Sequence, residues 1–112
     1  MPTTVDFIEY VCEQIAGTGA VRYRKMFGEY MVYVNDKPIL LVCDNTVYVK
    51  RLDFLAEKMK DAEVGPPYQG AKEHYILDID DGERAREIVS LLEPVTPLPR
   101  KKNSTAKSKG AK

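Results

Sequence analysis

The chain has 112 residues, and its 17 basic and 17 acidic side chains give a formal net charge of zero at pH 7. This length corresponds to one domain, large enough to bury a core without disulfides. No apolar run approaches membrane-spanning length, and no basic N-terminal segment precedes an apolar core, which argues against a membrane span and a secretory signal. Cys12 and Cys43 lie in apolar runs, as buried thiols of a reducing compartment do, so we expect a cytoplasmic protein without a disulfide.

The neutral total hides an uneven distribution of charge along the chain. Residues 100–112 contain six basic residues and no acid. The rest of the chain therefore holds 11 basic residues against all 17 acids, a net charge of −6. A folded surface that binds phosphate backbones usually has the opposite sign. The charge pattern argues against the folded part as a nucleic-acid platform.

The first element that the sequence predicts is a helix over about residues 4–16. Thr3, followed by Asp6, is typical of a helix N-terminus, and Gly17 is suited to end the helix. Apolar residues at helical spacing indicate one buried stripe, formed by Val5, Ile8, Cys12 and Ile15.

From residue 21 onward the pattern is that of antiparallel strands. Tyr, Val and Ile dominate, and turn residues recur at short intervals. Asp44-Asn45 is typical of a tight hairpin turn. The strands are expected near residues 21–26, 30–35, 39–43 and 46–50.

Two of these strands, 30–34 and 39–43, are apolar at nearly every position, which indicates burial on both faces. A second copy of the chain is the simplest cover for the second face, and helices divided over both faces are the alternative. We therefore predict a homodimer through this sheet. The candidate residues of the dimer face are Tyr30, Val32, Tyr33, Leu40 and Val42.

The remainder of the chain predicts two more helices and one strand. A short helix over 52–59, capped by Asp53, precedes Gly65-Pro66-Pro67; a half-buried strand covers 74–79; and a helix covers 82–92, capped by Asp80. The fold class is thus α+β, with two layers, about five antiparallel strands and three helices in the order α-β-β-β-β-α-β-α. Residues 1–93 form the domain, and 94–112 form a proline-rich stretch with a basic disordered tail.

Two segments of the chain resemble a known family. Arg24-Lys25-Met26-Phe27-Gly28-Glu29-Tyr30 with the apolar strands after it, and Pro66-Pro67-Tyr68-Gln69-Gly70-Ala71-Lys72, are similar to the N-terminal domain of the TfoX/Sxy family, named for regulators of bacterial natural competence. The resemblance runs from about Val5 to Leu92 and implies the same α+β fold. It also implies a regulatory setting, in which the competence regulators cooperate with the cyclic-AMP receptor protein at competence promoters.

Two-domain members of that family carry a C-terminal helical domain, and here a proline-rich stretch and a lysine tail follow instead, as in a single-domain form. The resemblance therefore predicts a non-catalytic interaction domain, a protein partner and a role in transcription regulation. No cofactor, metal site or nucleophile turn is indicated by the residues.

Two groups of residues are candidates for binding that partner. The loop of residues 66–72 offers Tyr68, Gly70 and Lys72, an aromatic face and a cation on a restricted backbone, although Tyr68 could instead fold back on the sheet as a plug. The early strand offers basic residues that either bind an acidic partner or simply face solvent: Arg22, Arg24 and Lys25.

Two alternative functions stay open at this point. The tail could bind nucleic acid without sequence preference or only aid solubility; its candidate contacts are Arg100, Lys101, Lys102, Lys107 and Lys109. A small ligand or an uncharacterised activity around His74 and Tyr68 is the other alternative.

Overall fold

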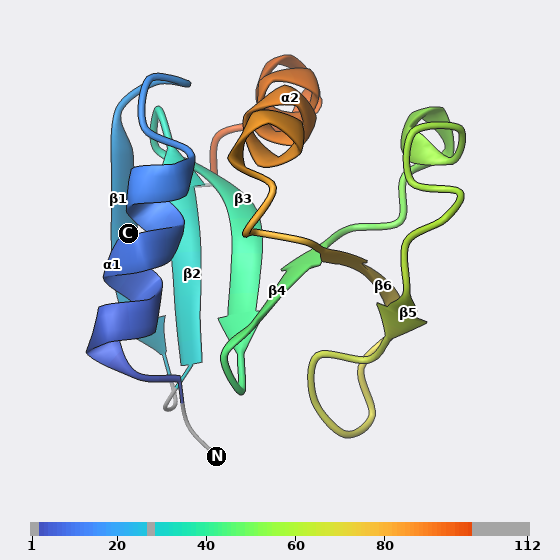
Figure 1. Cartoon of the computed structure of the whole chain (residues 1–112), viewed down its shortest axis with the longest axis horizontal. Coiled ribbons are helices and arrows are strands. Elements are labelled where there is room, and N and C mark those ends of the chain that lie inside the picture. Colours follow the sequence, from blue (N-terminus) through green and yellow to red (C-terminus); the bar gives the residue numbers. More distant parts are fainter. Residues whose placement is uncertain (1–2, 27–28, 100–112) are drawn as a thin grey trace, which may run out of the picture.

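The computed structural model describes residues 3–26 and 29–99 (Figure 1). It contains one six-stranded sheet in the order β1-β2-β3-β4-β6-β5, with every neighbouring pair antiparallel. The predicted α+β fold with one antiparallel sheet is therefore confirmed. The elements in chain order are α1 (Val5–Gln14), β1 (Val21–Met26), β2 (Glu29–Val34), β3 (Lys37–Cys43), β4 (Thr46–Val49), the 3₁₀ turn η1 (Asp53–Leu55), β5 (Val64–Gly65), β6 (His74–Leu77), α2 (Gly82–Leu92) and the 3₁₀ turn η2 (Glu93–Val95).

Two tight turns fix the register of the central strands. Asn35 and Asp36 between β2 and β3, and Asp44 and Asn45 between β3 and β4, all have φ between +52° and +66°. Two consecutive residues with positive φ match the right-handed twist of a hairpin, and Asn and Asp tolerate this conformation better than other side chains. The Asn35 side chain also accepts a hydrogen bond from the Ala20 amide at 2.9 Å, which ties this turn to the start of β1.

The capping residue of each helix lies one position later than the sequence predicts, although α2 itself begins at Gly82 as expected. Thr4, not Thr3, caps α1 by accepting from the Phe7 amide at 3.1 Å. Thr3 is instead only 7% exposed, and its hydroxyl accepts from the Asn45 amide at 3.2 Å. At α2 the cap is Asp81 rather than Asp80. A capping residue is recognisable by type, but two adjacent candidates are separated only by which one the loop can position.

The helix predicted over residues 52–59 is wrong. The structure has only the 3₁₀ turn η1 followed by further turns, and Leu52 at its start makes no side-chain capping bond. Asp53, the expected cap, lies inside the turn and accepts from the Ala56 amide. Only Leu55 and Met59 are buried along this stretch. Because the segment has no capping side chain and only two buried side chains, it does not offset the cost of nucleating an α-helix.

Strand β5 was not predicted, because two residues are too few for a periodic pattern. It joins the sheet beyond β6, where Val64 pairs with Tyr75 and Gly65 with His74. The sheet thus has six strands rather than five, and the α-helices number two rather than three among the described residues.

The hydrophobic core lies on one face of the sheet. Side chains of β2 alternate between buried and half-buried, so Tyr30, Val32 and Val34 point into the core. Helices α1 and α2 supply its other wall through residues such as Ile8 and Ile88. The two helices also contact one another, since Arg86 of α2 donates to the Gln14 carbonyl of α1 at 3.1 Å. The alternative of helices divided over both faces is therefore wrong.

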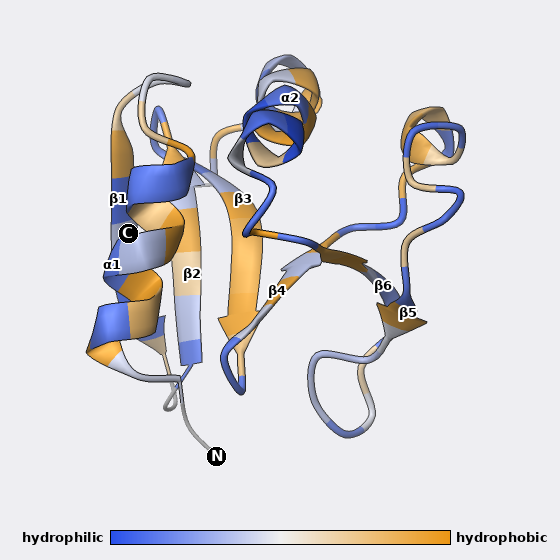
Figure 2. Cartoon of the chain, viewed as in Figure 1, coloured by the Kyte–Doolittle hydropathy of each residue, from blue (hydrophilic) through white to orange (hydrophobic). Residues whose placement is uncertain are grey.

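This arrangement corrects the predicted dimer face. Tyr30, Val32, Leu40 and Val42 are at most 4% exposed and belong to the core of the single chain. Tyr33 alone lies on the opposite face of the sheet, where it pairs with Pro38 beyond a bulge. The apolar run of β3, visible in Figure 2, serves the core with one set of side chains and leaves the other set partly exposed.

The end of α2 is held to the sheet by an ion pair that gives stability a pH dependence. Lys37 Nζ lies 3.1 Å from Glu93 Oε2 and also donates to the Glu93 carbonyl at 2.9 Å. The hydrogen bond from Lys37, with a second from Asn35, holds the pKa of the Glu93 carboxyl below its ordinary value of 4.5. A lowered native pKa contributes stability that is present above the ordinary pKa and is lost as pH falls through the native one.

We therefore expect acid to destabilise the wild-type protein more than the Glu93→Gln variant. Urea midpoints measured at neutral pH and across the range below 4.5 check this, because the difference between the two proteins should shrink as the carboxylate is protonated. Glu73→Gln is the matched control, since Glu73 forms an exposed ion pair with Arg51. A Glu93→Gln protein with the wild-type acid dependence would contradict this assignment.

Candidate interaction surface

A row of apolar side chains crosses the sheet on the face away from the helices. The register pairs Met31 with Leu41, Leu41 with Tyr48, and Tyr48 with Ile76, so one side chain each from β2, β3, β4 and β6 lies in line. These residues and Tyr33 are half-buried, in contrast to the fully buried residues between them. We call this set the open face: Met31, Tyr33, Leu41, Tyr48 and Ile76.

The open face has a shallow apolar groove of about 190 Å³. The Tyr48 and His74 rings meet edge to face along it, with centroids 6.4 Å apart. His74 Nδ1 donates to the Lys72 carbonyl at 2.9 Å, because a carbonyl oxygen only accepts. The groove is lined by Met31, Pro38, Ile39, Leu40, Leu41, Tyr48, Lys50 and His74.

The exposed strand β1 carries the basic residues predicted to bind a partner. Arg22, Arg24 and Lys25, called the basic edge below, are all exposed. Arg22 Nε lies 3.1 Å from Asp36 Oδ1, and its guanidinium lies 4.4 Å from the centre of the Tyr33 ring. Arg24 and Lys25 form no ion pair with any residue that the structure describes. Arg22 and Arg24 thus lie on the rim of the open face, whereas Lys25 pairs with Tyr30 and lies on the helix side.

The loop candidates lie at the other end of the sheet. Tyr68 is 60% exposed, which rules out the plug, and its carbonyl accepts from the Ala71 amide at 3.1 Å. Gly70 has φ +88°, a conformation that favours glycine, and Lys72 is exposed. Because this loop joins β5 to β6 and β1 is at the opposite edge, the two groups of candidates do not form one site (Figure 1).

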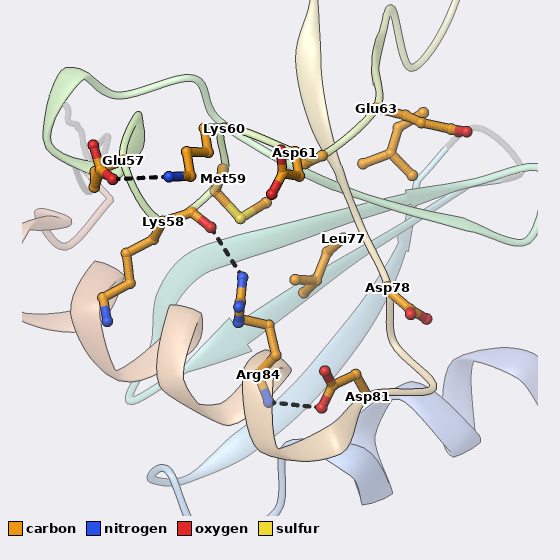
Figure 3. A pocket seen from close by; sticks show the side chains of 12 residues that line it. Glu57, Lys58, Met59, Lys60, Asp61, Glu63, Leu77, Asp78, Asp81 and Arg84 are labelled. Carbon is orange, nitrogen blue, oxygen red and sulfur yellow. Dashed lines mark hydrogen bonds and ion pairs between the residues drawn. The ribbon is translucent and has the colours of Figure 1, made fainter.

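A separate hollow of about 620 Å³ lies between the segment after η1, strand β6 and the start of α2 (Figure 3). Its polar side chains mainly join these elements. Arg84 donates to the Lys58 carbonyl at 2.9 Å, and Asp81 caps α2 through the Arg84 amide. Buried Met59 and Leu77 lie at its centre. Across residues 3–26 and 29–99, no group of three His, Cys, Asp or Glu side chains could hold a metal ion.

The residues suggested for a small ligand or an activity are not brought together. The hollow of about 750 Å³ beside His74 is lined by residues 50–53, 56 and 72–75, and Tyr68 is not among them. Cys12 and Cys43 are free thiols, as expected. Burial, with Glu29 nearby, raises the pKa of Cys43 to about 11, so this thiol is protonated and unreactive at neutral pH.

The five tail residues proposed to contact nucleic acid, Arg100, Lys101, Lys102, Lys107 and Lys109, lie outside the described residues. None of the helices in the described part of the chain has the length and apolar character needed to cross a membrane.

The fold and its surfaces define a small α+β domain with helices on one face of an antiparallel sheet and an apolar, uncharged row on the other. A family model described as TfoX N-terminal domain matches residues 13–89. The chain belongs to this family, which confirms the resemblance drawn from the sequence. It is also 30% identical over 113 residues to a Spirochaeta aurantia protein described as an uncharacterised 12.7 kDa protein in the trpE 5′ region, covering 99% of this chain and 98% of that protein.

Sequence reasoning missed four of the five open-face residues: Met31, Leu41, Tyr48 and Ile76. The signal that could have found them is the strict alternation of an antiparallel sheet with helices on one side. Once Val32 is assigned to the core, Met31 must face the other way, and the hairpin turns transmit that assignment to Leu41 and Tyr48.

Proposed function

We propose that this TfoX N-terminal domain is a non-catalytic interaction domain that acts in transcription regulation as a homodimer. The two copies pack through their open faces, and the basic edge and the loop of residues 66–72 stay available to a protein partner. Family membership supports a regulatory setting only through what the resemblance implies, and regulation of the competence type is the most specific form of this proposal.

The apolar character of the open face is the observation that carries this proposal. Antiparallel sheets with one solvated face normally place polar residues there. Here Met31, Leu41 and Ile76 lie in line across the sheet with Tyr48 between Leu41 and Ile76, and the nearest cation of β1, Arg24, pairs with Met31 at the rim. A contiguous apolar patch of this kind marks an interaction surface.

A second copy is the occupant we favour. The central row is uncharged, so two identical faces can meet without opposing like charges, and an isologous contact buries the same residues on both chains. The cations Arg22 and Arg24 lie on the rim, where each remains hydrated.

Light scattering during size exclusion tests the proposal. We expect a particle of twice the 12.7 kDa chain mass at micromolar concentration. A chain that remains monomeric at every concentration would overturn self-association. Affinity capture of binding proteins from the native cell, compared between the wild type and basic-edge variants, then tests whether a protein partner is held.

The six positive charges of residues 100–112 favour a second candidate function, nucleic-acid binding through the tail. Under this function, deleting residues 100–112 abolishes DNA or RNA affinity while thermal unfolding stays unchanged. The measurement is fluorescence anisotropy with labelled DNA and RNA over a salt series. The primary proposal expects no such affinity in the intact chain, so binding that vanishes with the tail decides for the second candidate.

A further inference from the structure

We propose that β1 binds an acidic segment of a partner protein in extended conformation, which adds to the sheet as a seventh strand. This inference names the partner chemistry of the basic edge and goes beyond self-association through the open face. It rests on the proposed interaction function but uses a different surface.

Strand β1 offers a regular, unpaired edge. It pairs with β2 over six residues without a register shift, and no described strand lies on its other side. An edge of this kind is a template for an incoming strand. Its residues are exposed at four of six positions.

The backbone groups that an incoming strand would use can be identified. The Asn35 amide donates to the Ala20 carbonyl at 2.9 Å, so Ala20 directs its backbone toward β2. This direction alternates along an antiparallel strand. Val21, Tyr23 and Lys25 therefore direct their amide and carbonyl groups outward, away from β2.

The side chains of β1 differ between the two faces of the sheet. Arg22 pairs with Tyr33 and Arg24 with Met31, so both arginines accompany the open face. Tyr23 lies on the helix side, where its ring meets the Tyr30 ring edge to face at 5.4 Å. Lys25 pairs with Tyr30 and also lies on the helix side. An incoming strand thus has two arginines beside it on one face, and Val21, Tyr23 and Lys25 on the other.

The helix side adds a further constraint on the partner. A groove of about 460 Å³ runs between α1 and β1, lined by Glu9, Cys12, Glu13, Val21, Arg22 and Tyr23. An acidic side chain on this face would meet the glutamates of α1, whereas an apolar one would contact Cys12, Val21 and Tyr23. The complementary segment therefore alternates acidic residues on the open-face side with apolar residues on the helix side.

Charge excludes a second copy as the occupant of this edge. Pairing β1 antiparallel with its own copy about Tyr23 would place Arg22 of each chain opposite Arg24 of the other, and like charges on paired strands destabilise a sheet. The Arg22–Asp36 ion pair does not block an acidic partner, because exposed pairs of this kind contribute little and exchange easily.

The test uses the full chain and a capped peptide of alternating glutamate and valine, long enough to span β1. We expect this peptide to bind at least tenfold more tightly than a peptide of the same composition with its glutamates grouped together. The grouped peptide has the same charge, so it measures plain attraction to the basic tail. Equal affinities for the two peptides in a calorimetric titration would overturn the proposal.

N-methylation of the peptide distinguishes strand addition from electrostatic attraction. In an antiparallel pair the residues opposite Tyr23 and Lys25 exchange hydrogen bonds with them, and these are the valines. Methylation of the valine amides is expected to abolish binding, and methylation of the glutamate amides to leave it within about twofold. Equal effects of the two modifications would contradict strand addition.

Protein variants locate the contact. Arg24→Glu is expected to weaken binding of the alternating peptide at least tenfold, and Lys72→Glu, an exposed cation at the other end of the sheet, to leave it unchanged. Equal losses in both variants would refute the assigned edge. If the full chain is a dimer but does not bind the alternating peptide, only this inference is overturned. If the chain is a monomer and binds the peptide, only self-association is overturned.

Discussion

Replacing Leu41 by aspartate is expected to convert the dimer into a folded monomer. Leu41 stands in the middle of the open-face row, between Met31 and Tyr48. In the dimer the carboxylate of the introduced aspartate would be buried without a partner. This burial costs several kcal/mol, which is enough to prevent association through an interface of modest size. In the monomer the same side chain reaches water, because this face is half-exposed. Light scattering gives the mass, and circular dichroism confirms that the chain is folded.

Phe54→Asp is the matched control for this prediction. Phe54 is apolar and 46% exposed, but it lies in η1 and not on the open face. This variant is expected to remain dimeric at the same protein concentration. If Leu41→Asp also remained dimeric, or if both variants became monomeric, the open face would not be the contact between copies.

The positions of the strands and their turns could be predicted because local chemistry determines them. Asn35-Asp36 and Asp44-Asn45 adopt the positive φ that tight hairpins require, and no tertiary information is needed to see this. The 52–59 segment shows the opposite case. Its apolar spacing is helical, but whether a short uncapped segment forms a helix depends on packing that the sequence does not reveal.

The candidate interface shows where pattern reasoning ends. Strands β2 and β3 are apolar at both parities, so their composition indicates two covered faces but does not say which parity meets the helices. The pattern predicts Tyr30 and Val32 on a dimer face, although they belong to the core that α1 and α2 cover. Helices α1 and α2 determine which face of the sheet is buried, because their apolar stripes pack against one side of it.

Leu40 and Leu41 are adjacent leucines on opposite faces, and alanine substitutions at the two positions should therefore behave differently. Leu40 is fully buried in the core, so Leu40→Ala is expected to lower the free energy of unfolding by about 2–5 kcal/mol through lost burial and the cavity left behind. Leu41→Ala removes a half-exposed side chain and is expected to cost about 1 kcal/mol or less in the monomer. Urea denaturation with a common slope measures both losses.

The dependence on protein concentration separates the two roles further. Binding of a second copy stabilises the folded chain by mass action, so a substitution that weakens the dimer loses more stability at high concentration than at low concentration. The loss for Leu41→Ala should therefore grow as the protein is concentrated, whereas the loss for Leu40→Ala should be large already in dilute solution. A loss for Leu41→Ala that is independent of concentration would contradict the packing of a second copy on the open face.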